Sequence, residues 1–192
     1  MTIAASQLAT YTAEEYLALE VQSDTRSEYR NGEIAPMTGG TPEHNKIASA
    51  LNALLWFGLR GEPYSVFVTD QRLWISAVDL YTYPDVMAIA DPVDLKPGRK
   101  DTVTNPLLIA EVLSDSTQSY DRGDKFEAYR TLPTLQEYLL IAQDRYYVEQ
   151  FVKQSEHQWL FTEYSGIDAK VMLSSLPVTL ELRDLYANVL GG

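Results

Sequence analysis

The chain has 192 residues, a formal net charge of −12 and a hydrophobic fraction of 45%. These values exclude a disordered protein, and the length is that of one folded domain over residues 1–192. The negative charge is opposite to the basic surface with which proteins bind nucleic acids, so it speaks against electrostatic binding of long duplex DNA.

No segment predicts secretion or membrane insertion. The first residues, MTIAASQLAT, lack the basic region and the apolar core of a secretory signal. The most apolar window, Ile47–Leu59, is too short and too polar to span a bilayer. The chain has no cysteine, which is compatible with the cytoplasm. We therefore expect a cytoplasmic protein that does not cross a membrane.

Two helices and a hairpin are predicted in the first third of the chain. A capping box at Thr12–Glu15 predicts a helix over Ala13–Glu20 with three apolar residues facing inward: Tyr16, Leu17 and Leu19. Asn31-Gly32 separates two extended runs, which predicts a type I′ hairpin. Thr41-Pro42-Glu43 begins a second helix that ends at Gly61, and its apolar residues recur at helical spacing: Ile47, Leu51, Leu54, Leu55 and Leu59.

Two short apolar runs in the middle of the chain predict buried strands, Val86–Ala90 and Pro106–Leu113. Each run carries one acid that a core strand does not tolerate unpaired, because Asp85 opens the first and Glu111 interrupts the second. The intervening residues Asp91–Asn105 are expected to form a solvated loop with three basic side chains: Lys96, Arg99 and Lys100. Strands are also predicted at Tyr64–Thr69 and Arg72–Ser76.

A helix follows the second acidic strand. Asp121 is expected to cap a helix over Arg122–Thr131, and Lys125 lies one turn from its start. Two acids on neighbouring strands and a lysine on the next helix offer a divalent cation two oxygen ligands beside a cationic group, which suits phosphodiester hydrolysis. The remaining predicted elements are strands at Glu137–Ala142, Tyr146–Lys153, Gln158–Tyr164 and Met172–Glu181, and a closing helix at Leu182–Leu190.

Four segments in this order carry a resemblance to a known family: Pro84-Asp85, Glu111-Val112-Leu113-Ser114, Asp121-Arg122-Gly123-Asp124-Lys125 and Glu137-Tyr138-Leu139-Leu140-Ile141. They resemble the PD-(D/E)xK nuclease superfamily and, within it, the bacterial restriction endonucleases of Uma type. The resemblance extends from about Tyr11 to Tyr186. It implies an α/β (α+β) fold like that of restriction endonucleases, in which helices flank a central mixed sheet, with an N-terminal hairpin and a C-terminal antiparallel extension.

The resemblance also implies a metal-dependent endonuclease that acts on DNA. Asp85 and Glu111 would bind Mg²⁺ (or Mn²⁺) together with the carbonyl of Val112, and Lys125 would orient a water or stabilise charge on the phosphate. Four residues are expected in an outer shell: Glu28, His44, Gln71 and Asp121. The superfamily places its lysine two residues after the acid, where this chain has Leu113, so Lys125 on the following helix is expected to replace it.

Several of these residues have a structural alternative. Asp121 and Lys125 are spaced i, i+4 and alternatively form an ordinary surface pair. Glu28 alternatively pairs with a neighbouring arginine, Arg26 or Arg30. His44 alternatively lies at the helix start with a local hydrogen bond.

Three functions stay open from the sequence. A DNA endonuclease is favoured by Asp85, Glu111 and Lys125. A catalytically silent, homodimeric scaffold or binding protein of the same fold is favoured by the net charge of −12. A hydrolase of small phosphoesters would tolerate an acidic exterior. Aromatic residues on the terminal strands mark either a homodimer surface or ordinary core packing: Tyr146, Tyr147, Trp159 and Phe161.

Overall fold

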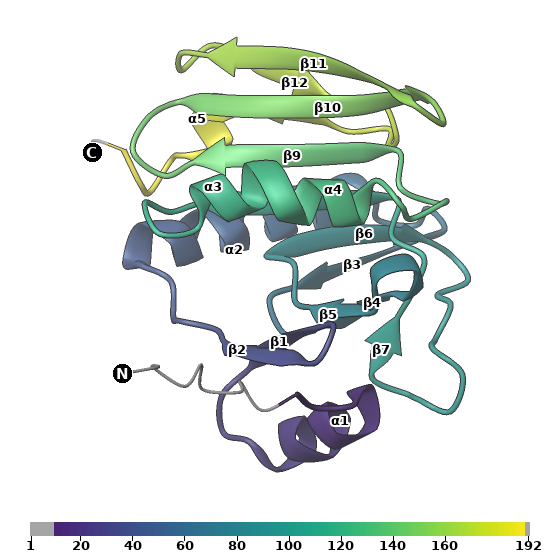
Figure 1. The fold of residues 1–192 in the computed structure, drawn as a ribbon. Helices are drawn as coiled ribbons and strands as arrows, with labels where there is room; N and C mark the ends of the chain where they lie inside the picture. Colours follow the sequence, from purple (N-terminus) through teal and green to yellow (C-terminus); the bar gives the residue numbers. More distant parts are fainter. Residues whose placement is uncertain (1–9, 191–192) are drawn as a thin grey trace.

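A computed structural model describes residues 10–190, in which the larger sheet has the strand order β11-β10-β9-β8-β6-β3 (Figure 1). β8 and β9 are parallel and the other neighbours are antiparallel, so the sheet is mixed, as predicted. Its strands are β3 (Tyr64–Val68), β6 (Val86–Ala90), β8 (Leu108–Leu113), β9 (Glu137–Ala142), β10 (Tyr147–Ser155) and β11 (Gln158–Ser165).

Helices cover both faces of this sheet. Figure 1 shows α2 (Pro42–Gly58) behind the strands and a second helical segment in front of them. That segment consists of α3 (Gln118–Tyr120), η2 (Asp121–Lys125) and α4 (Phe126–Tyr129). In β8, Leu108, Ala110 and Val112 join the core beside α2, whereas Ile109 and Leu113 join the core beside α4. Because side chains alternate along a strand, Glu111 lies on the α4 side.

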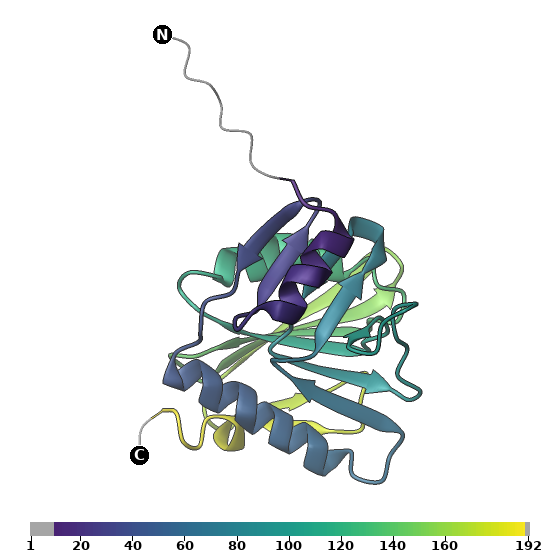
Figure 2. The ribbon, with the colours of Figure 1, turned by 90° about the horizontal axis from the view of Figure 1, so that it is seen from below.

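A five-stranded sheet packs at the N-terminal end of the molecule, with the order β2-β1-β5-β4-β7. Figure 2 shows α1 (Ala13–Gln22) lying across it, and three buried tyrosines fill the space between them: Tyr16, Tyr29 and Tyr81. Asn31 and Gly32 have φ values of 48° and 95°, which confirms the predicted hairpin. The strands are β1 (Ser27–Arg30), β2 (Glu33–Pro36), β4 (Arg72–Ile75), β5 (Leu80–Thr82) and β7 (Thr102–Val103), and a 3₁₀ turn, η1 (Ser76–Val78), follows β4.

Several local predictions were wrong. Residues 172–181 do not form one strand, because Ser174–Pro177 reverse the chain between β12 (Lys170–Met172) and β13 (Thr179–Glu181). The closing helix is shorter than predicted, α5 (Leu182–Leu185). Leu19 is 52% exposed instead of facing inward. Among the residues that the structure describes, no helix is both long and apolar enough to cross a bilayer.

The helical segment that carries Lys125 begins earlier than predicted. Ser114 Oγ accepts a hydrogen bond from the Thr117 N–H at 3.2 Å, and the Ser114 carbonyl accepts one from the Gln118 N–H at 2.9 Å. The helix therefore starts in the Ser/Thr-rich turn and continues into a π-helical turn at η2. Asp121 lies inside the helix and does not cap it. Single π-helical turns occur frequently at functional sites.

Candidate active site

Asp85 and Glu111 lie side by side on neighbouring strands. β6 and β8 pair antiparallel with Val86 opposite Ala110, so the next residues outward, Asp85 and Glu111, are cross-strand neighbours. The Asp85 N–H donates a hydrogen bond to Glu111 Oε2 at 3.2 Å. The two acids that the sequence singled out thus converge at one end of this strand pair.

Lys125 lies among three carboxylates. Its Nζ is 3.1 Å from Glu111 Oε1, 3.3 Å from Asp121 Oδ1 and 3.6 Å from Glu28 Oε1. Lys125 and Asp121 are both buried, so their contact is not the surface pair that the i, i+4 spacing also allowed.

Burial and the crowding of acids shift the proton equilibria of this cluster. Burial raises the pKa of Glu111 to about 8, although the Lys125 ammonium lowers it and Asp85 and Asp121 raise it further. Burial alone would lower the pKa of Lys125, but the neighbouring carboxylates raise it well above its usual value. Lys125 is therefore a permanent cation, and one ammonium does not compensate the surrounding carboxylates.

One oxygen of Asp85 carries two contacts, a hydrogen bond and an ion-pair contact. Asp85 Oδ2 accepts from the Val112 N–H at 2.8 Å and lies 3.0 Å from His44 Nε2. No hydrogen bond from residues 10–190 ends on Oδ1 of the same carboxylate. The observed contact of Val112 is made by its N–H, and its carbonyl as a metal ligand stays a prediction.

The structure brings most of the expected outer residues into this cluster. Glu28 does not pair with Arg26 or Arg30: its carboxylate accepts hydrogen bonds from Tyr120, at 3.1 Å, and from Thr82. His44 contacts Asp85, as described above. Gln71 is not brought in, because its side-chain amide donates to the carbonyl of Asp101 at 3.0 Å.

Tyr129 is a site residue that the sequence reasoning missed. Its hydroxyl donates to Glu111 Oε1 at 2.6 Å, so it shares this oxygen with the Lys125 ammonium. A signal was present in the sequence, because Tyr129 lies four residues after Lys125 and thus on the same helix face.

A cavity of about 490 Å³ opens onto these groups. Two hydroxyl-bearing segments contribute to its walls, one through Thr38 and Thr41 and the other through Ser114, Ser116 and Thr117. The charged residues in its lining are the acids Asp70, Asp85, Glu111 and Asp121 and the cations Arg26 and Lys125. Arg26 pairs with Asp70 at 2.8 Å. The cavity is therefore acidic and hydroxyl-rich, not a basic cleft.

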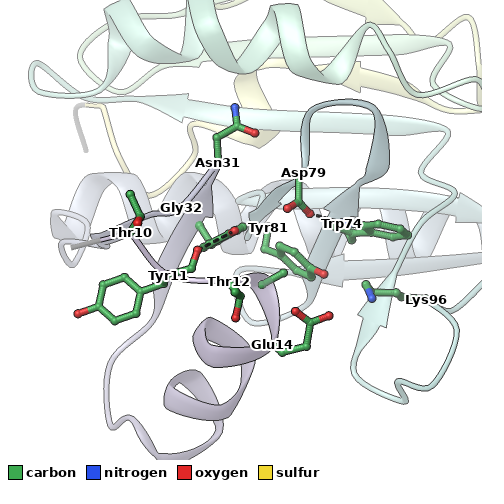
Figure 3. A pocket seen from close by; sticks show the side chains of 12 residues that line it. Thr10, Tyr11, Thr12, Glu14, Asn31, Gly32, Trp74, Asp79, Tyr81 and Lys96 are labelled. Atoms are coloured by element: carbon green, nitrogen blue, oxygen red, sulfur yellow. Dashed lines mark hydrogen bonds between the residues drawn. The ribbon is translucent and has the colours of Figure 1, made fainter. Parts of the chain in front are cut away.

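A second cavity, of about 540 Å³, lies beside α1 and the five-stranded sheet (Figure 3). Lys96 lies in it with its ammonium 4.6 Å from the ring centre of Trp74. Arg99, from the same predicted basic loop, pairs with Asp101 at 2.5 Å. None of the predicted site residues lines this cavity. Its larger volume therefore does not make it the site of the chemistry.

The donor set of the acid cluster fits Mg²⁺ or Mn²⁺. Within residues 10–190, no three His, Cys, Asp or Glu side chains are grouped as a metal site. Mg²⁺ does not need three, because it is commonly held by one or two carboxylates together with waters and substrate phosphates. Asp85 and Glu111 supply two such carboxylates, and the excess of acids around Lys125 favours an additional cation.

Comparison with known proteins adds to these observations. A sequence profile of the Uma2 family, described as "Putative restriction endonuclease", matches residues 13–185. The uncharacterized Synechocystis protein sll1609 is 44% identical over 167 residues, which are 87% of this chain and 94% of that protein. The uncharacterized Synechocystis protein slr1290 is 35% identical over 175 residues, 90% of each chain.

A solved structure shares the fold. The crystal structure of "a putative nuclease" from Anabaena variabilis matches with a TM-score of 0.74 and 20% sequence identity, over 94% of this chain and 99% of that one. The match confirms the predicted arrangement of mixed sheets flanked by helices.

Proposed function

Because the chain belongs to the Uma2 family of restriction-endonuclease-like proteins, we propose that it is a metal-dependent endonuclease that hydrolyses phosphodiester bonds in DNA. One observation carries the proposal. Asp85 and Glu111 converge from two strands at the wall of a cavity, and Lys125 Nζ lies 3.1 Å from Glu111. Two hard oxygen ligands beside a fixed cation suit phosphodiester hydrolysis with Mg²⁺.

Asp85 and Glu111 would hold Mg²⁺ or Mn²⁺, with the Val112 carbonyl as a further ligand. When bound, such an ion polarises the phosphoryl group and lowers the pKa of a water molecule. Lys125 and Tyr129 both donate to Glu111 Oε1 and thereby hold the orientation of this carboxylate.

Lys125 acts as an electrostatic group in this proposal. Because the surrounding carboxylates keep its pKa high, Lys125 does not accept a proton near neutral pH and is not a general base. Its ammonium stabilises negative charge that develops on the phosphate. The hydroxyl-rich segments on the cavity wall add neutral hydrogen-bond donors for phosphate oxygens.

A second candidate function, hydrolysis of small phosphoesters, is favoured by the charge of the cavity. Its lining contains four acids and two cations, and one of these cations, Arg26, is already paired with Asp70. Such a lining offers few contacts to a long phosphate backbone, whereas a compact substrate with its own bound cation would fit it.

A cleavage assay tests the proposal and separates the two substrates. We would compare the wild type with Asp85→Ala and Lys125→Ala on supercoiled, linear and single-stranded DNA and on bis(p-nitrophenyl) phosphate, with Mg²⁺, Mn²⁺ or EDTA. Asp124→Asn serves as control, because this acid lies on the same helical segment but is 62% exposed. We expect metal-dependent DNA cleavage by the wild type and the control, and its loss in both site variants.

Two outcomes would contradict the proposal. Equal cleavage by all four proteins would indicate a contaminating nuclease. Cleavage of the small diester without cleavage of any DNA would favour the second candidate.

A further inference from the structure

We infer that His44 is a positioning residue that fixes one oxygen of Asp85 and leaves the other directed to a cation, and that Gly40 provides the space for its imidazole. The inference rests on the proposed function, because it assigns Asp85 to a divalent cation. It concerns residues that set the orientation of the Asp85 carboxylate, and not the metal ligands themselves.

The two carboxylate oxygens of Asp85 differ in their contacts. Both contacts fall on Oδ2: His44 Nε2 lies 3.0 Å from it as an ion-pair partner, and the Val112 N–H donates a hydrogen bond to it at 2.8 Å. A carboxylate held through one oxygen cannot rotate freely, so the position of Oδ1 is set as well. The Val112 donor is a backbone N–H that any residue except proline would supply. His44 is therefore the side chain on which this constraint depends.

The imidazole of His44 is buried in a way that fold stability does not explain. Its Nδ1 is buried without a hydrogen-bond partner in the described residues, and its side chain is 14% exposed. Buried polar atoms in folded proteins are normally paired, so an unpaired one calls for another reason. The start of α2 does not need this ring, because the backbone N–H of His44 is already bonded to Thr41 Oγ1 at 3.1 Å. The contact with Asp85 supplies that reason.

Gly40 makes room for the ring. A Cβ on Gly40 would lie 2.6 Å from His44 Nδ1 and 2.9 Å from its Cγ, both too short for any real contact. A Cβ on the adjacent Gly39 would have no atom within 4 Å. Neither glycine has the positive φ that side chains rarely adopt. Alanine at position 40 would thus displace the imidazole, whereas alanine at position 39 would not.

Mn²⁺ binding provides a readout that does not require cleavage. We would titrate the metal-free full-length protein and its variants with Mn²⁺ by calorimetry, and measure kcat and KM for DNA in parallel. Loss of a partner that orients a metal ligand typically weakens metal affinity about 10–100-fold. We expect this loss in His44→Ala and in Gly40→Ala. Gly39→Ala should bind Mn²⁺ like the wild type, and His44→Gln, which keeps an N–H donor, should recover part of the affinity.

The kinetic constants and a double variant add two controls. Because the constraint acts through Asp85, we expect a lower kcat and an unchanged KM in His44→Ala. Because Gly40 acts through the ring, His44→Ala combined with Gly40→Ala should lose no more affinity than His44→Ala alone. Circular dichroism identifies a variant that fails to fold, and if Gly40→Ala does so, His44→Ala and His44→Gln carry the test.

The outcomes distinguish this inference from the proposed function. Wild-type affinity in His44→Ala, equal affinity of Gly40→Ala and Gly39→Ala, or absence of Mn²⁺ binding by the wild type would overturn the inference. A wild type that binds Mn²⁺, loses affinity in His44→Ala as expected and cleaves no DNA would support the inference and refute the endonuclease.

Discussion

Two buried glutamates on neighbouring parallel strands differ in what surrounds them. Glu111 on β8 is 2% exposed and Glu137 on β9 is fully buried. Neutral donors satisfy Glu137: Ser175 donates from its N–H at 2.9 Å and from its hydroxyl at 2.6 Å, and Gln150 donates from its side-chain amide. Glu111 also accepts from two neutral donors, the Tyr129 hydroxyl and the Asp85 N–H. Unlike Glu137, however, it shares the Lys125 ammonium with two further acids.

Both carboxylates are buried, so their neighbours distinguish the one that stabilises the fold from the one that we propose to bind a metal. The bonds of Glu137 connect β9 to β10 and to the link between β12 and β13, and they contribute to stability. Around Glu111, by contrast, three further acids lie near a single ammonium, and the group faces a cavity. A bound cation would strongly stabilise the ionised form of a carboxyl group that is buried among other acids.

Replacing each glutamate by glutamine should have different effects on DNA cleavage. Glu111→Gln removes a carboxylate that we propose as a metal ligand, and we expect DNA cleavage to fall on the order of 10³-fold, since metal ions supply several kcal/mol of transition-state stabilisation. Glu137→Gln should cleave like the wild type. Initial rates with Mg²⁺ would measure both. A similar loss in both variants would show that the comparison between the two sites is wrong.

Lys125→Met should affect both activity and stability. We expect cleavage to fall about 10²–10³-fold, as for removal of one preorganised charge donor. The free energy of unfolding should fall by about 3–5 kcal/mol, because the substitution leaves buried carboxylates without their cation. Urea unfolding at pH 8.5 without metal would measure the second effect. An unchanged stability would mean that Glu111 and Asp121 are neutral in the folded protein.

The pH dependence of stability should sharpen the comparison. The folded pKa of Glu111, about 8, lies above its ordinary value of 4.5, so the folded state binds the proton more tightly than the unfolded state. The stabilisation from this group is fully present below about pH 4.5 and is lost as the pH rises through about 8. In EDTA, the Tm of the wild type should therefore fall more steeply from pH 5 to pH 8.5 than that of Glu111→Gln. Parallel curves would contradict the shifted pKa.

The smallest expected effect is the cost in stability of Glu137→Gln. In Glu137→Gln an NH₂ group replaces one of the two accepting oxygens. This NH₂ group then faces a donor of either Gln150 or Ser175, so one buried donor loses its acceptor. We expect the free energy of unfolding to fall by about 1–3 kcal/mol. Urea unfolding of Glu137→Gln beside Glu111→Gln would show this difference, and an undiminished stability of Glu137→Gln would exclude the structural role.

Much of the fold and part of the site followed from local patterns. The capping box at Thr12–Glu15 and the Asn31-Gly32 turn both form as predicted, because their hydrogen bonds and backbone angles are set within a few residues. Asp85 and Glu111 could also be recognised from the sequence, because each is an acid in an apolar run. A charged group in a core strand requires a compensating partner wherever the strand lies in the fold.

The partners of these residues depended on contacts between distant segments. Glu28 and Gln71 were both expected in the outer shell, yet only Glu28 lies beside Lys125, because strand pairing and the π-helical turn bring those segments together. The opposition of Asp85 to Glu111, 26 residues apart, depends on the register of β6 against β8. The contact of His44 with Asp85 depends on the packing of α2 against the sheet.

The sequence by itself determined which residues carry charge into the core and where most helices and strands lie, because these depend on residue chemistry and short-range hydrogen bonds. The tertiary structure alone decided which of those charges meet, which are satisfied by neutral donors and which face the cavity. The physical reason is that a carboxylate's protonation and metal affinity are set by atoms within a few ångströms, and most of those atoms come from remote parts of the chain.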